Sequence, residues 1–154
     1  MPKSKKVIID LDVVTLAFWD KKDGAKLIER IKANEFEMIS PYILLDHLSK
    51  WDYRKLAEEI REFYEKYSSE IITARNLLEK TEEINIEYYK ILNELISIGV
   101  KEEDVVLVII SSLFNVDNLI TFNRKHLKNK EKEIGEVLKR YGIKTIQIKL
   151  PSEV

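Results

Sequence analysis

The hydrophobic and polar pattern of the chain predicts strands at its two ends. Residues 7–9 are three consecutive β-branched apolar residues, which is typical of a strand buried on both faces. Residues 118–121 and 143–150 predict two later strands, and Pro151 ends the second of them. Met38 and Ile39 indicate a further short extended segment. Long stretches without a strand pattern thus separate these predicted strands.

Those stretches carry apolar residues at helical spacing, with Lys and Glu between them. The spacing predicts helices, and Gly99 and Gly142 are expected to follow the ends of two of them. Ser40 and Pro41 are expected to be an N-cap and a first helical position, which would place Asp46 near the second turn. The helices are expected over residues 23–33, 53–66, 71–80, 81–98 and 130–141, with one more starting at Pro41.

Residues 105–110 fit two secondary structures. They are six aliphatic residues, five of them β-branched, which favours a strand. The polar residues 101–104 before them resemble a first helical turn, where acidic side chains interact well with the helix dipole. A buried helix is therefore equally allowed by the pattern.

Strands at both ends with helices between them predict one α/β domain over residues 1–154. Right-handed crossovers would give a three-layer fold, with a central, mostly parallel sheet flanked by helices. Ligands of such sheets bind at the carboxyl ends of the strands. Asp10 and Asn123 fall at such ends, so we expect the site there.

Composition narrows the class of protein. The chain is 45% apolar and 34% charged, has a formal net charge of -1 and contains no cysteine. A near-neutral balance gives no global argument for nucleic acid, so any such contact needs a local patch. Lack of cysteine excludes thiol catalysis and disulfides, and suits the cytoplasm. Abundant Lys, Glu and Ile is typical of heat-adapted proteins.

Neither a signal peptide nor a membrane span is expected. The apolar run after the basic N-terminus is broken at once by Asp10 and Asp12. The longest apolar run, residues 105–114, is far shorter than the ~20 residues that cross a bilayer.

The pair Asp10 and Asp12 allows two interpretations. Two carboxylates this close repel each other, and a bound cation would relieve the repulsion. Alternatively, one of them caps the following helix and the other is solvated.

Four segments of the chain resemble the motifs of PIN domains. Residues 7–14 look like the opening strand of that family, which ends in a metal-binding aspartate, here Asp10. Residues 39–46 are similar to the second motif, which normally ends in glutamate and here ends in Asp46. Residues 99–104 resemble the third motif, in which an aspartate, here Asp104, begins a buried helix. The resemblance thus implies that residues 105–110 are helical.

The fourth motif and the site follow from the same resemblance. Residues 119–127 are similar to a strand, a Thr and an acid two residues later, with Thr121 in place and Asn123 standing for the acid. The resemblance spans essentially the whole chain and implies a VapC-like ribonuclease of archaeal or thermophilic type. Asp10, Asp46 and Asp104 would hold Mg²⁺ or Mn²⁺, hard cations that prefer oxygen ligands. Asn123 would coordinate through its amide oxygen or position water, Thr121 would orient a carboxylate, and Asp12 would lie further out.

The resemblance also implies partners. RNA would be the substrate, an antitoxin-like protein would accompany a VapC-type toxin, and PIN domains commonly form homodimers. Aromatic residues between Tyr42 and Tyr89 are expected in the core or a dimer interface. Arg124, Lys125 and Lys128 form a local basic cluster that would hold RNA phosphates, and its alternative is a solvated loop. His47 and His126 are expected to be caps or packed side chains.

Two other functions compete with a ribonuclease. Residues 10–14 after three aliphatics also resemble the first motif of haloacid-dehalogenase-like phosphatases, in which Asp10 would be the nucleophile and Asp12 the acid. That family needs a late acidic pair, which the region after Thr121 lacks. A PIN-like binding module with a weakened metal site is the other alternative, supported by Asp46 and Asn123.

Overall fold

The computed structural model describes residues 4–19 and 22–154, and leaves out the side chain of Asp23 as well. The first three residues of the basic N-terminal stretch, which enter the expectation that no signal peptide is present, lie outside the described residues. Among the described residues, no helix combines the length and the apolarity that crossing a membrane requires.

The centre of the fold is a parallel sheet of five strands in the order β3-β2-β1-β4-β5. Every neighbouring pair of strands runs parallel. The α/β class expected from the sequence is therefore confirmed, and the sheet is wholly parallel. The strands are β1 (Lys5–Ile9), β2 (Phe36–Pro41), β3 (Ser68–Ile72), β4 (Asn118–Ile120) and β5 (Gln147–Lys149).

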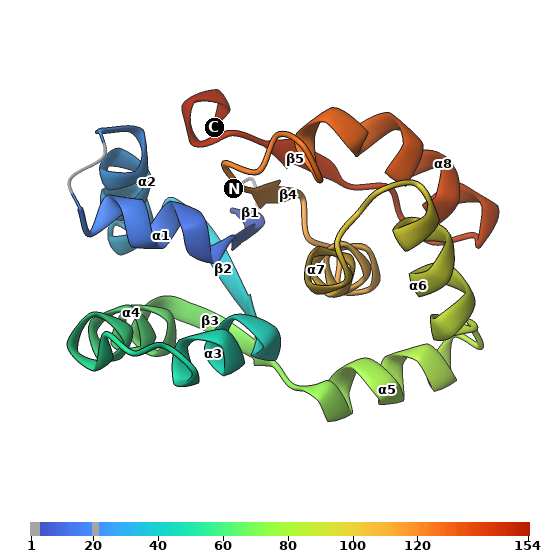
Figure 1. The fold of residues 1–154 in the computed structure, drawn as a ribbon, viewed down its shortest axis with the longest axis horizontal. Helices are drawn as coiled ribbons and strands as arrows, with labels where there is room; N and C mark the ends of the chain where they lie inside the picture. Colours follow the sequence, from blue (N-terminus) through green and yellow to red (C-terminus); the bar gives the residue numbers. More distant parts are fainter. Residues whose placement is uncertain (1–3, 20–21) are drawn as a thin grey trace.

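Helices cover the sheet on both sides, which gives three layers (Figure 1). The first four helices gather on one side, α7 and α8 lie on the other with α6 beside them, and α5 runs along one edge. The helices are α1 (Leu11–Ala17), α2 (Lys22–Lys32), α3 (Tyr42–Ser49), α4 (Arg54–Tyr67), α5 (Ala74–Glu83), α6 (Tyr88–Ser97), α7 (Glu102–Leu113) and α8 (Glu131–Arg140). A 3₁₀ turn at Lys128–Lys130 directly precedes α8, and another at Pro151–Glu153 follows β5.

The ambiguous aliphatic run is helical, as the resemblance implied. It forms most of α7, in which every residue from Val105 to Leu113 is buried. A helix that is apolar all round is stable only inside a protein, and α7 lies between the sheet and α6, with α3 also in contact. Tertiary burial thus overrides the strand preference of its β-branched residues.

Ser40 is not a helix cap, contrary to the expectation. Ser40 and Pro41 complete β2, and α3 starts at Tyr42 with Pro41 in the capping position and no side-chain cap. The buried Ser40 hydroxyl instead forms a hydrogen bond with the hydroxyl of Ser68 on β3. The strand extends further because β3 lies beside it, and the sequence pattern gave no sign of β3.

The helix expected over residues 71–80 begins and ends three residues later, as α5. Residues Ser68–Ile72 form strand β3, and α5 begins after Thr73. The Thr73 hydroxyl accepts from the N–H of Asn76, whose side chain accepts from the N–H of Thr73. This reciprocal cap fixes the start of α5.

The helix expected over residues 81–98 is broken in two. Asn85 adopts a left-handed conformation with φ 55°, a region that Asn tolerates better than most residues. The chain leaves α5 at this point and starts α6 at Tyr88. The end of α6 is as expected, since Gly99 follows it at φ 104°.

The final strand is also shorter than expected. Residues 143–146 form no strand, and β5 covers only Gln147–Lys149. Gly142 at φ 70° follows the end of α8, as expected. The β4 partner is itself only three residues long, so β5 has no neighbour to pair with over its earlier residues.

Candidate functional site

The candidate site lies between β1 and β4, where the order in which the chain adds strands to the sheet reverses. From β1 the chain moves to β2 and β3 on one side, and it later returns to β4 and β5 on the other. β1 and β4 are therefore neighbours, and ligands of open α/β sheets bind outside the carboxyl ends of such a pair. Asp10 directly follows β1 and Thr121 directly follows β4. The N–H of Asp10 donates to the carbonyl of Ile120 at 2.8 Å, which fixes the two ends together.

A chain of hydrogen bonds joins the polar residues at this point. The Thr121 hydroxyl donates to Asp10 Oδ2 at 2.8 Å and accepts from the N–H of Asn123 at 3.0 Å. The Asn123 side chain then donates through Nδ2 to Asp104 Oδ2 at 3.1 Å. Three residues predicted for the site, Asp10, Asn123 and Asp104, are thus brought together although they are distant in sequence. The Thr121 hydroxyl thus holds one carboxylate oxygen of Asp10.

The amide of Asn123 has a defined orientation. Its Oδ1 accepts from the backbone N–H of His126 at 3.0 Å. An N–H group can only donate and a carboxylate can only accept, so Oδ1 faces His126 and Nδ2 faces Asp104. The amide oxygen that was expected to coordinate a cation or position water is therefore already engaged, and Asn123 acts here as a donor to a carboxylate.

The structure contains elements of both interpretations of the Asp10 and Asp12 pair, the helix cap and the cluster of carboxylates. Asp10 caps α1, because its Oδ1 accepts from the N–H of Leu11 at 2.8 Å. Asp12 lies in the first turn of α1 and accepts weakly from the N–H of Phe122 at 3.4 Å. Both carboxylates therefore face the end of β4. One residue is a helix cap, and both also belong to the acidic cluster.

The carboxylates are costly to ionise where they lie. Burial raises the pKa of Asp12 to about 7, with the charge of Asp10 adding to the rise. Burial likewise raises the pKa of Asp104 to about 6, again with help from Asp10. The pKa of Asp10 is raised by burial, against the hydrogen bonds from Thr121 and Leu11, which lower it. Negative charge in this cluster is therefore insufficiently compensated by the protein itself.

Asp46 does not take part in this arrangement. Its side chain is exposed, and it is not among the residues that line the small pocket of about 70 Å³ beside Asp10 and Asp104. Three residues of α3 line the pocket, namely Ile43, Leu44 and His47, and His47 is the polar one among them.

Two residues at this pocket were not predicted for the site. His47 and Glu103 both line it, and His47 Nε2 lies 3.8 Å from Glu103 Oε2. The sequence did hold a signal, since His47 follows the apolar Ile43 by one helical turn and Ile43 also lines the pocket. The expectation that His47 is a packed or capping side chain misses this position.

Tyr64 fixes the backbone of β1 next to Asp10. It is fully buried, and its hydroxyl donates to the carbonyl of Ile9 at 2.8 Å, one residue before Asp10. Burial raises the pKa of Tyr64 well above its usual value, and the charges of Asp10 and Asp12 raise it further. The phenol is therefore a permanent donor, and it fixes the end of β1 against α4.

The predicted basic cluster separates into two parts. Arg124 and Lys125 are exposed and, among the described residues, form no ion pair. Lys128 instead donates to the carbonyl of Ile148 at 2.8 Å and lies 3.4 Å from Glu153. Lys128 therefore ties β5 and the C-terminal turn to the loop after β4. His126 is half-buried, and its Nδ1 lies 3.1 Å from the carbonyl oxygen of Gly99.

The acidic cluster fits a hard divalent cation in its chemistry. Asp10, Asp12 and Asp104 offer carboxylate oxygens of the kind that Mg²⁺ and Mn²⁺ prefer, in a half-buried place without enough positive charge. As the side chains lie, no three His, Asp or Glu residues within residues 4–19 and 22–154 are close enough to share one ion. The oxygens are held instead by Thr121, Leu11 and Asn123.

Comparison with known proteins finds similarity in structure alone. No family model and no curated protein sequence matches the chain. Among solved structures it is similar to VapBC2 from Rickettsia felis, bound to a DNA fragment from their promoter, with a TM-score of 0.60 and 13% sequence identity. The match covers 94% of this chain and 98% of that chain. The fold is PIN-like. The fold class implied by the four motifs is thus confirmed, and at this identity the likeness concerns the fold.

Proposed function

We propose that this PIN-like chain is a metal-dependent endoribonuclease. The observation that carries the proposal is the cluster of Asp10, Asp12 and Asp104 at the switch point of the sheet. Half-buried carboxylates with raised pKa values, placed where α/β proteins bind ligands, mark a functional site better than a structural one. The VapBC likeness of the fold supports a nuclease in particular.

Asp10 and Asp104 would hold Mg²⁺ or Mn²⁺, with Asp12 behind them. When bound, such a cation would supply Lewis-acid chemistry and activation of water for phosphodiester hydrolysis. Thr121 fixes one carboxylate, and Asn123 bonds the other. Asp46 stays outside the pocket, and Glu103 and His47 occupy the position next to it.

Exposed cations beside the cluster would bind the RNA. Arg124 and Lys125 directly follow Asn123 and are free of ion pairs in the described chain, so they can reach phosphates near the metal. Lys128 leaves this set because its ammonium group is bound to the C-terminal turn.

The partners belong to the same proposal. The structural neighbour is a VapBC complex, which supports an antitoxin-like protein as a partner of this chain and a role as a VapC-type toxin. We also expect a homodimer. The lack of cysteine supports a cytoplasmic setting.

A PIN-like binding module is the second candidate function. It is favoured by one observation, namely that Asn123 has an amide where the family has an acid and uses it to bond Asp104. Such a module would keep the fold and bind partners without cleavage. The phosphatase alternative gains no support from the structural neighbour.

The test is a digest of single-stranded RNA with Mg²⁺ or Mn²⁺, using protein free of any partner. Asp104→Asn should remove nearly all cleavage and keep the fold, because it deletes an anionic ligand. Asp12→Asn should cost less. Glu136→Gln, an exposed change of equal charge on α8, is the matched control. Wild-type protein that leaves several RNAs intact with Mn²⁺ would refute the nuclease and favour the binding module.

A further inference from the structure

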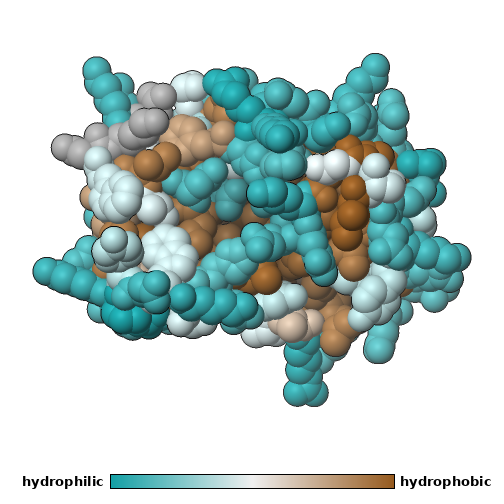
Figure 2. All heavy atoms as spheres, viewed as in Figure 1, coloured by the Kyte–Doolittle hydropathy of each residue, from teal (hydrophilic) through white to brown (hydrophobic). Residues whose placement is uncertain are grey.

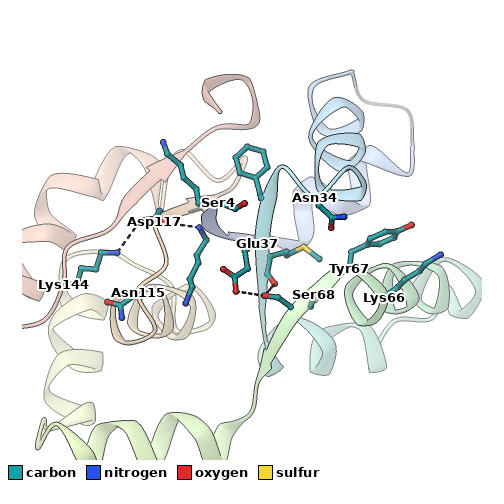
Figure 3. Close-up of a pocket in the computed structure, with 14 residues that line it drawn as sticks. Ser4, Asn34, Glu37, Lys66, Tyr67, Ser68, Asn115, Asp117 and Lys144 are labelled. Carbon is teal, nitrogen blue, oxygen red and sulfur yellow. Dashed lines mark hydrogen bonds and ion pairs between the residues drawn. The ribbon is translucent and has the colours of Figure 1, made fainter. Parts of the chain in front are cut away.

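The opposite edge of the sheet carries a second feature that the proposed nuclease site does not use. A groove of about 1180 Å³ runs across the amino-terminal starts of β1, β2 and β3. Figure 3 shows it between Lys144, Asp117 and Asn115 on one side and Lys66, Tyr67 and Asn34 on the other, with Glu37 and Ser68 between them. We name it the lysine groove after Lys5, Lys6, Lys66 and Lys144, which line it.

The charge of the groove is opposite to that of the chain. Four lysines line it against two acidic residues, Glu37 and Asp117, whereas the whole chain carries a formal net charge of -1. Positive charge is therefore concentrated at this edge. A local concentration of positive charge attracts anionic ligands.

The two acids are engaged in the walls of the groove. Asp117 Oδ2 accepts from the N–H of Lys6 at 2.9 Å, and Oδ1 lies 3.8 Å from Lys144 Nζ. Glu37 Oε1 accepts from the Ser69 hydroxyl at 3.2 Å. These bonds hold both carboxylates to the protein and leave the remaining lysines to the solvent.

Three lysines of the groove have no acidic partner in the part of the chain that the structure describes. Lys5, Lys6 and Lys66 form no ion pair among the described residues. Lysine at the end of a helix is often explained by the helix dipole, and that account fits Lys66 at the end of α4. It does not fit Lys5 and Lys6, which start a strand. The protein alone therefore leaves their position unexplained.

The shape and the neutral groups indicate what kind of anion would bind. The groove exceeds the ~300–1,000 Å³ of small-molecule pockets, which suits an extended chain better than a compact ligand. Asn34 and Asn115 lie in left-handed turns at φ 59° and 56° and line the groove, and their side-chain amides can donate to phosphate oxygens.

Base stacking is not the mode of contact. Lys66 and Lys32 lie over the ring of Tyr67, at 5.3 and 5.8 Å from its centroid. Arg30 lies 4.6 Å over the ring of Phe36. The aromatic faces of the groove are thus occupied by cations, so the groove offers charge and hydrogen bonds to a backbone instead of platforms for bases.

We propose that the lysine groove binds the phosphate backbone of single-stranded RNA, without preference for sequence. Three unpaired lysines give three phosphate contacts. Binding is then strongly dependent on salt, because each contact releases condensed counterions from the strand. The groove lies at the amino-terminal ends of the strands, and the acidic cluster lies at their carboxyl ends. RNA binding in the groove therefore does not depend on cleavage.

The test measures binding of fluorescein-labelled 20-nucleotide oligouridylate by fluorescence anisotropy. Every protein carries Asp104→Asn, so that cleavage plays no part. Lys5→Gln, Lys6→Gln and Lys66→Gln together should weaken binding at least tenfold and lower the slope of log affinity against log salt by about 2. The matched control changes three exposed lysines elsewhere, Lys26, Lys132 and Lys139, to Gln.

The parent protein carries only Asp104→Asn, the groove variant adds the three changes in the lysine groove, and the control variant adds the three changes elsewhere. Equal affinity of the groove variant and the control variant would overturn the proposal. Failure of the parent protein to bind the oligomer in 50 mM salt would also overturn it. A groove variant that does not fold is replaced by crosslinking of 4-thiouridine RNA to the parent protein. Crosslinks in residues 66–69 support the groove, and crosslinks confined to residues 123–128 refute it. Failure of RNA cleavage by wild-type protein would refute the nuclease and leave this result unchanged.

Discussion

At the scale of single residues, the acidic cluster stores unfavourable charge. Asp12 is half-buried, and burial together with Asp10 raises its pKa from 3.8 to about 7. A raised pKa means that the folded protein holds this proton more tightly than the unfolded chain does. The free energy of unfolding therefore falls as pH rises from about 4 to about 7. Function accounts for such an arrangement better than stability does.

Asp12→Asn removes that penalty. Without divalent metal, we expect the variant to be about 1 kcal/mol more stable than wild type at pH 7.5, after allowance for solvent screening, and its stability to vary less between pH 5 and 7.5. Thermal unfolding in EDTA measures both effects. Asp52→Asn, at an exposed position, should leave the pH dependence unchanged. A lower Tm for Asp12→Asn at every pH would contradict the expectation.

Asn123→Asp tests the amide that faces Asp104. Without metal, the change replaces a donated hydrogen bond by repulsion between carboxylates and should cost about 1–3 kcal/mol. Mn²⁺ should then raise the Tm of the variant more than that of wild type, because a hard cation gains from an added carboxylate. Thermal unfolding with and without Mn²⁺ is the measurement, and the exposed Asn93→Asp is its control. An identical response to Mn²⁺ in both proteins would rule out a cation at this place.

At the scale of elements, caps and turn residues decide where helices start and stop. Thr73 closes β3 and opens α5 through its reciprocal bonds with Asn76. Asn85 ends the same helix by its left-handed backbone. These caps and turns divide residues 68–98 into a strand and two helices, where apolar spacing alone indicated two helices over residues 71–80 and 81–98.

Thr73→Ala should destabilise the protein by about 1 kcal/mol, since it leaves backbone N–H groups at the start of α5 without a side-chain acceptor. Chemical denaturation gives the free energy of unfolding. Arg75→Ala is the control in the same helix turn, because its ion pair with Glu79 is largely exposed and contributes little. Equal effects of the two substitutions would show that the cap does not fix α5.

At the scale of the whole molecule, apolar surface remains uncovered. Figure 2 shows hydrophobic surface between the hydrophilic side chains on the face that it presents. On α5 and α6 and the link between them, several large apolar side chains are exposed, namely Leu78, Ile84, Tyr89 and Ile96. Exposed apolar side chains on neighbouring elements can form an interface between proteins when they lie together on one surface.

We therefore expect a homodimer at micromolar concentration, with a mass twice that of the 18.2 kDa chain by light scattering. Leu78→Glu combined with Tyr89→Glu should give a monomer, because charges would be buried in the interface. Gln147→Glu, exposed on β5, adds a charge elsewhere and should leave the dimer intact. A wild-type protein of monomeric mass would exclude this surface as a dimer interface.

The sequence by itself determined the α/β class and most of the elements, and it singled out three residues that the fold brings together at one end of the sheet. Val7, Ile8 and Ile9 predict a buried strand because a short run of β-branched residues fits a sheet that is covered on both faces. Asp10, Asn123 and Asp104 follow from that pattern together with the motif resemblance. These features depend on short stretches of chain, where local preference and tertiary structure agree.

Only the tertiary structure decided the rest. β3 is a strand because β2 lies beside it, and residues 105–113 are a helix because neighbours on all sides bury it. The structure also turned His47 instead of Asp46 toward the pocket, since the rotation of α3 is set by the packing of Leu44 and Leu48 in the core. Sequence spacing fixes angles between side chains within a helix. The direction in which the helix faces depends on contacts with residues far away in the chain.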